Sequence, residues 1–290
     1  MQPELKTLAV NGVDLGYCEW GRPRDDAPSL LFVHATGFHG RVWDYHIEAL
    51  GDVHCIALDQ RGHGRSTKSA VQHWSTFGDD QAQFVQALGL NGLIGIGHSM
   101  GAHAMIEGAA KSGAFARLLL LDPTVASPEA YAQTPLNPFG EGLHPAAKRQ
   151  RFYASPEDMI ERLGAKSSFP HFHARIFDDY CRYGLETDAE HGWRLACEPE
   201  VEAAVYMSAR SNGAIYDSVR HLDIPVTIVR AQTPGPDQLH DFSMSPTWPG
   251  LAGRFPQARD LHWSDCTHFI PMQRPDEVVA LIREEMAAPG

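Results

Sequence analysis

A serine at the apex of a tight turn is the residue of this sequence that points most directly to chemistry. Ser99 is the centre of Gly-His-Ser-Met-Gly at 97–101, between an apolar run at 93–96 and a helix-favouring run at 102–110. This pattern predicts a strand, a sharp turn and a helix, and the two glycines permit a turn in which larger side chains would collide with both elements. We expect the turn to push the Ser99 hydroxyl out of the sheet, towards the positive end of the helix dipole.

A serine hydroxyl needs a base before it can act as a nucleophile at neutral pH, and imidazole has a suitable pKa. Among 16 histidines, His268 follows the last predicted strand and precedes the terminal helix. In a parallel sheet that loop lies at the same carboxyl edge as the Ser99 turn, so His268 is the expected base. His98, adjacent to the nucleophile, is expected to support the site and to contact the substrate.

The acid that holds the imidazole must also lie at this edge of the sheet. Asp122 ends the predicted strand 117–122 and is followed by proline, a pair that is also typical of turns. Asp237 lies in a loop rich in proline and glycine after the strand 224–230. We favour Asp122, because the end of a strand fixes geometry better than such a loop, and keep Asp237 as the alternative.

Composition limits the classes of partner. The chain has 290 residues, of which 43% are hydrophobic and 21% charged, enough for one α/β domain with an insertion. The formal net charge of -12 argues against nucleic acid and against anionic membrane surfaces as partners. A small-molecule substrate is expected, and a homo-oligomer is left open.

The cysteines and the N-terminal segment favour a cytoplasmic protein. Five cysteines are scattered without a C-x-x-C pair, which indicates reduced thiols. Neither a secretory signal nor a run long enough to span a bilayer is visible. His171 and His173 have no carboxylate or cysteine that would complete a metal motif, so we expect no metal and no cofactor.

Strand-like runs alternate with helical stretches, which predicts an α/β fold with a mostly parallel, eight-stranded sheet. The expected strands are 5–10, 14–20, 29–34, 53–59, 92–97, 117–122, 224–230 and 259–263. Asn11-Gly12 predicts a two-residue hairpin between the first two strands. The four leucines at 118–121 suit a strand that helices cover on both faces.

The pattern changes between 127 and 219, where amphipathic helical stretches replace strand signals. We interpret this segment as a helical cap inserted after the sixth strand, with residues 1–126 and 220–290 forming the core. Some of its aromatic residues are expected to line an apolar pocket over Ser99, together with Phe38 and Met100. The aromatic residues considered are Phe139, Phe152, Tyr153, Phe169, Phe172, Phe177, Tyr180, Tyr183 and Trp193.

Four landmarks appear in an order that resembles the α/β-hydrolase superfamily, and in particular its esterase-like members with a helical cap. They are His-Ala-Thr-Gly-Phe at 34–38, Asp-Gln-Arg-Gly-His-Gly-Arg-Ser at 59–66, the serine turn at 97–101 and Thr-His-Phe at 267–269. The resemblance covers residues 5–286 and implies the chain order serine, acid, histidine. It implies an oxyanion hole formed by the backbone N–H groups of Met100 and Thr36, whereas the loop at 59–66 is interpreted as structural.

The chain departs from the family at the usual position of the acid, in a G-x-x-D pattern after the seventh strand. Ala231 stands at the glycine position and Pro234 at the acid position. Some members carry the acid after the sixth strand instead, which corresponds to Asp122 here.

The leading hypothesis is a serine hydrolase that cleaves a small, mostly apolar carboxylic ester through an acyl-enzyme. One alternative is a carbon–carbon bond hydrolase acting on a ring-cleavage product. Another is a non-catalytic ligand-binding member of the same fold. Fold resemblance alone does not decide among them.

Overall fold

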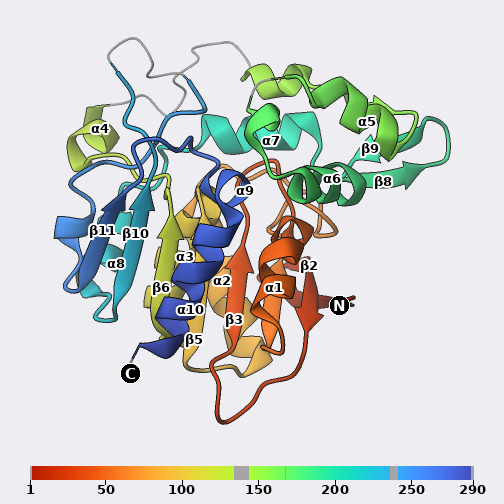
Figure 1. Cartoon of the computed structure of the whole chain (residues 1–290). Helices are drawn as coiled ribbons and strands as arrows, with labels where there is room; N and C mark the ends of the chain where they lie inside the picture. The colour runs from red at the N-terminus through yellow and green to blue at the C-terminus, as the bar shows by residue number, and fades with distance from the viewer. Residues whose placement is uncertain (1, 134–143, 167, 236–240, 289–290) are drawn as a thin grey trace.

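The computed structural model describes residues 2–133, 144–166, 168–235 and 241–288, and its centre is an eight-stranded sheet (Figure 1). The strands are β1 (Glu4–Val10), β2 (Val13–Trp20), β3 (Leu30–Val33), β4 (Cys55–Leu58), β5 (Leu93–His98), β6 (Phe115–Leu121), β10 (Val226–Arg230) and β11 (Ala258–His262). Their order is β1-β2-β4-β3-β5-β6-β10-β11. The predicted α/β class and all eight predicted strands are confirmed.

The register of the sheet brings the strand ends that matter to one edge. The hairpin between β1 and β2 turns at Asn11 and Gly12, whose φ angles of 47° and 75° suit a two-residue turn. From β4 to β11 every neighbouring pair is parallel. His98 pairs with Leu121, so the residues after β5 and β6, Ser99 and Asp122, emerge at the same carboxyl edge.

Helices cover both faces of the sheet (Figure 1). One face carries α1 (Asp44–Leu50) and α10 (Pro275–Ala287), and the other carries α2 (Ser75–Leu88), α3 (Met100–Ser112) and α8 (Ile215–His221). The leucines of β6 alternate between two apolar clusters: Leu119 and Leu121 pack with the first pair of helices, and Leu118 and Leu120 with the other three. Each buried leucine contributes about 1.5–3 kcal/mol.

A second layer lies over the carboxyl edge of the sheet (Figure 1). We call its described residues, 144–166 and 168–207, the cap segment. It contains α5 (Pro156–Leu163), α6 (Ala174–Tyr183) and α7 (Pro199–Met207), with α4 (Pro128–Gln133) preceding it. It also contains a three-stranded sheet in the order β7 (Phe152–Tyr153), β9 (Gly192–Leu195), β8 (Leu185–Asp188). The prediction of a helical insertion missed this sheet, whose strands of two to four residues are too short for a period to be visible.

The cap segment shares its apolar core with one face of the sheet. Met159, Ile176 and Tyr180 belong to the same cluster as Leu121. The predicted boundary at 219/220 falls within α8, which packs against α3 on the sheet. Because the cap segment and the sheet share one apolar core and the second boundary falls inside a helix, the division into core and cap at 126/127 and 219/220 stays a prediction.

The remaining elements are short. Turns of 3₁₀ helix occupy Gly40–Trp43, Pro145–Lys148, Phe169–His171 and Ala252–Arg254, and α9 (Ile270–Gln273) leads into α10. Across the residues that the structure describes, no helix combines the length and the apolar character that a membrane span requires.

The turn between β5 and α3 has the geometry that its glycines predict. Ser99 has a φ of 57°, a conformation that costs non-glycine residues of the order of 1–3 kcal/mol. A Cβ on Gly101 would lie under 3.0 Å from the carbonyl oxygens of Val33 and His34, and one on Gly97 equally close to the backbone of Ala102. Glycine at both positions lets α3 approach the sheet and hold the serine at this angle.

Replacing Gly101 by alanine should lower the free energy of unfolding by about 1–3 kcal/mol, because the methyl group forces α3 away from β3. The matched control is Gly253→Ala, where an added Cβ meets no atom within 4 Å and the expected change is below about 0.5 kcal/mol. Urea denaturation measures both. Equal midpoints for the two variants would contradict the account of the turn.

Candidate active site

Ser99 and His268 are separated by 169 positions in the chain and meet at the carboxyl edge of the sheet. The His268 Nε2 atom lies 2.9 Å from the Ser99 Oγ atom. Ser99 is 7% exposed and His268 is 9% exposed, so both are almost enclosed but border a cavity. The distance is that of a hydrogen bond, as a serine nucleophile and its base require.

Asp122 is the carboxylate that contacts the other nitrogen of this imidazole. Its Oδ2 atom lies 2.7 Å from His268 Nδ1. Its Oδ1 atom accepts hydrogen bonds from the backbone N–H of Ala231 at 3.1 Å and from the hydroxyl of Ser245 at 2.5 Å. The Thr247 hydroxyl lies 3.0 Å from the same oxygen and shares its proton with the Pro123 carbonyl, 2.7 Å away. Four donors thus surround a fully buried side chain, an arrangement that suits an ionised carboxylate.

The Asp122 backbone is strained in the same sense as that of Ser99. Its φ is 47°, and its N–H donates to the Val229 carbonyl at 2.7 Å. That bond fixes the residue between β6 and β10, so the carboxylate points across the end of the sheet. The strand-end argument for Asp122 therefore agrees with where the structure places it. The alternative, Asp237, lies outside the described residues.

The loop that departs from the family pattern has two other contacts here. Ala231, at the usual glycine position, supplies the N–H that binds Asp122, and Pro234, at the usual acid position, lines the cavity. A carboxylate after β6 reaches the edge of the sheet where the family usually has one after β10, because β6 and β10 are neighbours in the sheet.

The loop of His268 is held by hydrogen bonds from three segments, two of them through side chains and one through a backbone carbonyl. Gln273 Oε1 accepts from the N–H and the hydroxyl of Thr267, and the Ser243 carbonyl accepts from the N–H of His268 at 2.7 Å. His98 Nε2–H donates to the His268 carbonyl at 2.9 Å. Burial and the neighbouring His268 keep the pKa of His98 well below its usual value, so a neutral ring with a single N–H fits this bond.

His98 is fully buried and is not among the residues that line the cavity. The structure therefore does not bring it to the place where a substrate would lie, although the sequence suggested contact with the substrate. Its ring is tilted against that of His268, with centroids 5.0 Å apart. Its observed contacts are those of a support for the base.

A cavity of about 330 Å³ opens above Ser99. Most of its wall is apolar. The residues that line it are Ala35, Thr36, Phe38, Trp74, Ser99, Thr124, His144, Pro145, Tyr206, Met207, Ala209, Arg210, Pro234, Asp241, Phe242, Met244, Ser245, Pro246, His268 and Phe269. The volume is at the lower end of the range for small-molecule sites.

The aromatic wall differs from the one that the sequence suggested. Eight of the nine aromatic residues considered in the insertion are described, and none of them lines this cavity; Phe139 lies outside the described residues. Several pack against one another, for example Phe169 against Phe172 and Phe177. Tyr206, Phe242 and Phe269 supply rings in their place, and two of these come from outside the predicted insertion.

Phe38 and Thr36 line the cavity as expected from the loop at 34–38, but the Met100 side chain does not. Met100 is fully buried in a cluster with Trp74, Phe77 and Val205. Only its backbone, at the first turn of α3, lies beside Ser99. The first N–H groups of a helix have no partner within the helix, so this position suits an anion.

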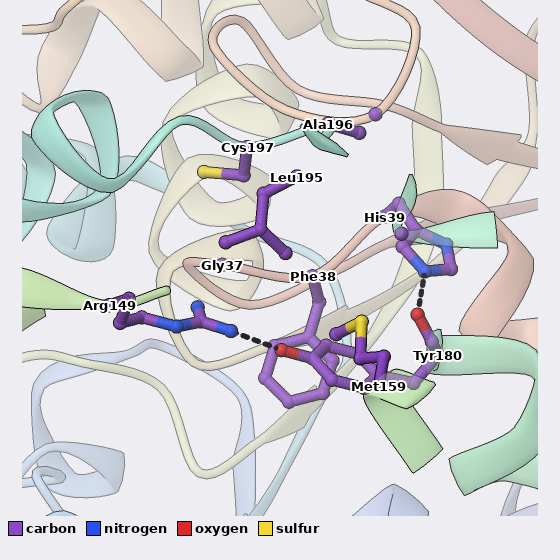
Figure 2. A pocket seen from close by; sticks show the side chains of 11 residues that line it. Gly37, Phe38, His39, Arg149, Met159, Tyr180, Leu195, Ala196 and Cys197 are labelled. Carbon is purple, nitrogen blue, oxygen red and sulfur yellow. Dashed lines mark hydrogen bonds between the residues drawn. The ribbon is translucent and has the colours of Figure 1, made fainter. Parts of the chain in front are cut away.

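The cap segment backs the loop that carries Thr36 (Figure 2). Arg149 pairs with Glu202, and its Nη2 donates to the Tyr180 hydroxyl at 2.8 Å. A Cβ on Gly37, whose φ is 80°, would lie 2.8 Å from Glu202 Oε1, so the carboxylate packs directly on this glycine. The ring of His39 donates through Nε2 to the Tyr180 carbonyl at 3.1 Å.

These contacts tie the position of the loop to the cap segment. Phe38 also packs on Tyr180, with ring centroids 4.9 Å apart. Neither contact of Arg149 had a signal in the sequence, because Glu202 and Tyr180 lie 53 and 31 positions away from it with no motif between them.

The loop at 59–66 braces the site from below, as its interpretation as structural requires. Asp59 accepts from the N–H of Gly40 at 2.6 Å and from the N–H of Arg65 at 2.9 Å. His34 Nε2 accepts from the N–H of Gln60 at 3.0 Å, and burial lowers the pKa of His34 to about 4, which leaves that nitrogen free to accept. None of these residues lines the cavity.

Metal ligands are not grouped in the described part of the chain: no three His, Cys, Asp or Glu side chains there could hold an ion. His173 instead packs against Tyr45, with ring centroids 4.5 Å apart. All five cysteines are buried as free thiols.

Three residues near the site were missed by the sequence reasoning. Ser245 and Thr247 bind Asp122 from a loop with no recognisable motif. Thr124 lines the cavity and its Oγ1 lies 3.1 Å from Ser99 Oγ. Its position two residues after the acid, at the same strand end, was a usable signal.

Comparison with known proteins agrees with this architecture. Residues 30–281 match the model of the alpha/beta hydrolase family. Lipase LipV of Mycobacterium tuberculosis is 26% identical over 264 residues, covering 89% of this chain and 92% of the lipase. A non-heme chloroperoxidase of Streptomyces lividans is 31% identical over 235 residues, covering 75% of this chain and 78% of the relative.

A solved structure, that of E-2-(acetamidomethylene)succinate hydrolase, superposes with a TM-score of 0.74. It is 21% identical and covers 99% of this chain and 100% of its own, a likeness that concerns the fold alone. Since the family model spans most of the sequence, and the sheet and the serine turn have the family's arrangement, this chain belongs to the α/β hydrolase family.

Proposed function

We propose that this hydrolase cleaves a small, mostly apolar carboxylic ester through an acyl-enzyme formed on Ser99. One observation carries the proposal: His268 bridges Ser99 Oγ at 2.9 Å and Asp122 Oδ2 at 2.7 Å at the floor of a cavity. One relative named as a lipase and one named as a bifunctional esterase/perhydrolase support the same chemistry.

In the proposed reaction His268 Nε2 takes the Ser99 proton while Oγ attacks the ester carbonyl. The imidazolium then gives this proton to the departing alcohol. Water repeats the cycle on the acyl-enzyme and releases the acid. Asp122 keeps the Nδ1–H of His268 directed at itself, so that Nε2 faces the serine, and its negative charge stabilises the imidazolium.

The oxyanion that forms would lie between the backbone N–H groups of Met100 and Thr36. Met100 follows the nucleophile at the start of α3, and Thr36 borders the cavity on the opposite loop. Backbone donors held by α3 and by the cap contacts at Gly37 are fixed before the substrate arrives, which is what stabilisation of a developing charge requires.

The proposed substrate class rests on the apolar lining and the size of the cavity above Ser99. Phe38, Trp74, Phe242 and Met244 make an apolar lining suited to a short acyl or alcohol group. The volume of about 330 Å³ favours small esters over long-chain lipids.

The second candidate, carbon–carbon bond hydrolysis of a ring-cleavage product, has one observation in its favour. Arg210 lines the cavity and would supply positive charge to a substrate carboxylate. Asp241 lines the same cavity and opposes this preference, so the ester is favoured.

A fluorophosphonate should add mass to Ser99 of the folded protein, because His268 activates the hydroxyl. The Ser99→Ala variant should show no label, and a Ser69→Ala variant, altered at a half-buried serine outside the cavity lining, should label like the unmodified chain. Intact-protein and peptide mass spectrometry locate the adduct. Folded protein that never labels would favour the non-catalytic ligand-binding alternative.

Hydrolysis of p-nitrophenyl esters should be fastest for short acyl chains and fall steeply for long ones, because the cavity cannot enclose a long chain. The value of kcat/KM for each ester, compared with that for a dienoate ring-cleavage product, separates the two candidates. Ser99→Ala is the blank for every substrate. A dienoate that is hydrolysed faster than any ester would replace the ester proposal by the second candidate.

A further inference from the structure

Thr124 is a polar cavity residue that the reaction described above does not use. It lies on the loop after β6, and its Oγ1 is 3.1 Å from the Ser99 Oγ. The Ser99 hydroxyl therefore has two hydrogen-bond partners, the His268 imidazole and the Thr124 hydroxyl. Either of two hydroxyls that meet at this distance can be the donor, so the direction of the bond must come from the rest of the network.

The protons available to Asp122, His268 and Ser99 decide the direction of the hydrogen bond between Ser99 and Thr124. Asp122 has only acceptor atoms when ionised, and its Oδ2 takes the Nδ1–H of His268. A neutral imidazole then has a bare Nε2, which accepts the Ser99 proton. Because the Ser99 proton is committed to His268, the contact with Thr124 has the threonine O–H as donor and Ser99 Oγ as acceptor.

The backbone of Thr124 is held from both sides. Its N–H donates to the Ser99 carbonyl at 3.2 Å, and its own carbonyl accepts the Nδ1–H of His103 at 2.9 Å. Asn212 Nδ2 donates to His103 Nε2 at 3.1 Å. Burial lowers the pKa of His103 to about 4, so its ring is neutral and has the single N–H that this chain of bonds needs. The network sets the threonine hydroxyl in place before any substrate binds.

We propose that Thr124 is a catalytic residue whose hydroxyl donates a hydrogen bond to Ser99 Oγ when that oxygen is the leaving group. The inference rests on the acyl-enzyme of the proposed function. In deacylation, water attacks the acyl carbon and gives a proton to His268 Nε2. The bond between the acyl carbon and Oγ then breaks, its electron pair stays on Oγ, and the imidazolium returns the proton to Oγ.

The Thr124 hydroxyl stabilises the charge on Oγ while that bond breaks. Its contribution to acylation is smaller, because the same hydrogen bond occupies a lone pair of the attacking oxygen and weakens as the ester forms. Removing the hydroxyl should therefore slow deacylation more than acylation. A hydrogen bond to a group that gains charge corresponds to about ten- to hundredfold in rate.

The experiment is stopped-flow hydrolysis of the best p-nitrophenyl ester by the full chain and by Thr124→Val and Thr124→Ser. Valine keeps the shape of threonine without the hydroxyl, and serine keeps the hydroxyl without the methyl. We expect Thr124→Val to deacylate about ten- to hundredfold more slowly, with acylation changed only a few-fold, so that a nitrophenol burst precedes a slow steady state. Thr124→Ser should restore deacylation to within a few-fold of the original rate.

Three results would overturn the inference. In the first, the unmodified chain is active and the Thr124→Val variant acylates and deacylates at the same rates. In the second, the rates of acylation and deacylation fall equally in Thr124→Val and Thr124→Ser does not restore them, which indicates a structural role. Thermal melting checks the fold, and Thr124→Ala replaces the valine variant if that one does not fold. A chain that neither labels at Ser99 nor turns over any ester removes the proposed function, and this inference with it.

Discussion

The bridge that the His268 imidazole makes between Asp122 and Ser99 is the contact on which the account of the site depends. Its three members come from three different strand ends, and the parallel register of β5 and β6 places two of them side by side. Ser99 and Asp122 both have positive φ values, of 57° and 47°. Such conformations persist only where the surroundings over-determine them. Glycines that admit α3 to the sheet do this for Ser99, and four hydrogen-bond donors do it for the Asp122 side chain.

The cap segment takes part in this geometry. Its apolar residues belong to the same cluster as one face of the sheet, and its Arg149–Glu202 pair packs on Gly37. Removing one partner of a largely buried ion pair leaves an uncompensated charge, which typically costs several kcal/mol. Changes in the cap would therefore act on the loop of Thr36 as well as on the cavity wall. The cap thus contacts the loop of one of the two proposed oxyanion donors.

The sequence predicted the parts of the structure whose signals are local. Eight strands could be assigned from short apolar runs, and the turn at Ser99 from the spacing of Gly97 and Gly101. Asp122 could be favoured because the end of a strand is a fixed position in a parallel sheet, although the family pattern pointed to the loop containing Asp237. The contact between Ser99 and His268 followed from the same reasoning about sheet edges.

What could not be predicted depends on how distant segments dock. The strands β7, β8 and β9 are too short to show a period. The rings of Tyr206 and Phe242 line the cavity because their segments meet above the sheet, a packing that no spacing encodes.

Proton NMR of the Nδ1–H that His268 shares with Asp122 tests the central claim most directly. A far-downfield resonance should be present in the unmodified chain, absent in His268→Ala, and lost or strongly shifted in Asp122→Asn. Asp237→Asn should leave it unchanged. A resonance that survives in Asp122→Asn but disappears in Asp237→Asn would contradict the account, because another carboxylate would then hold the imidazole.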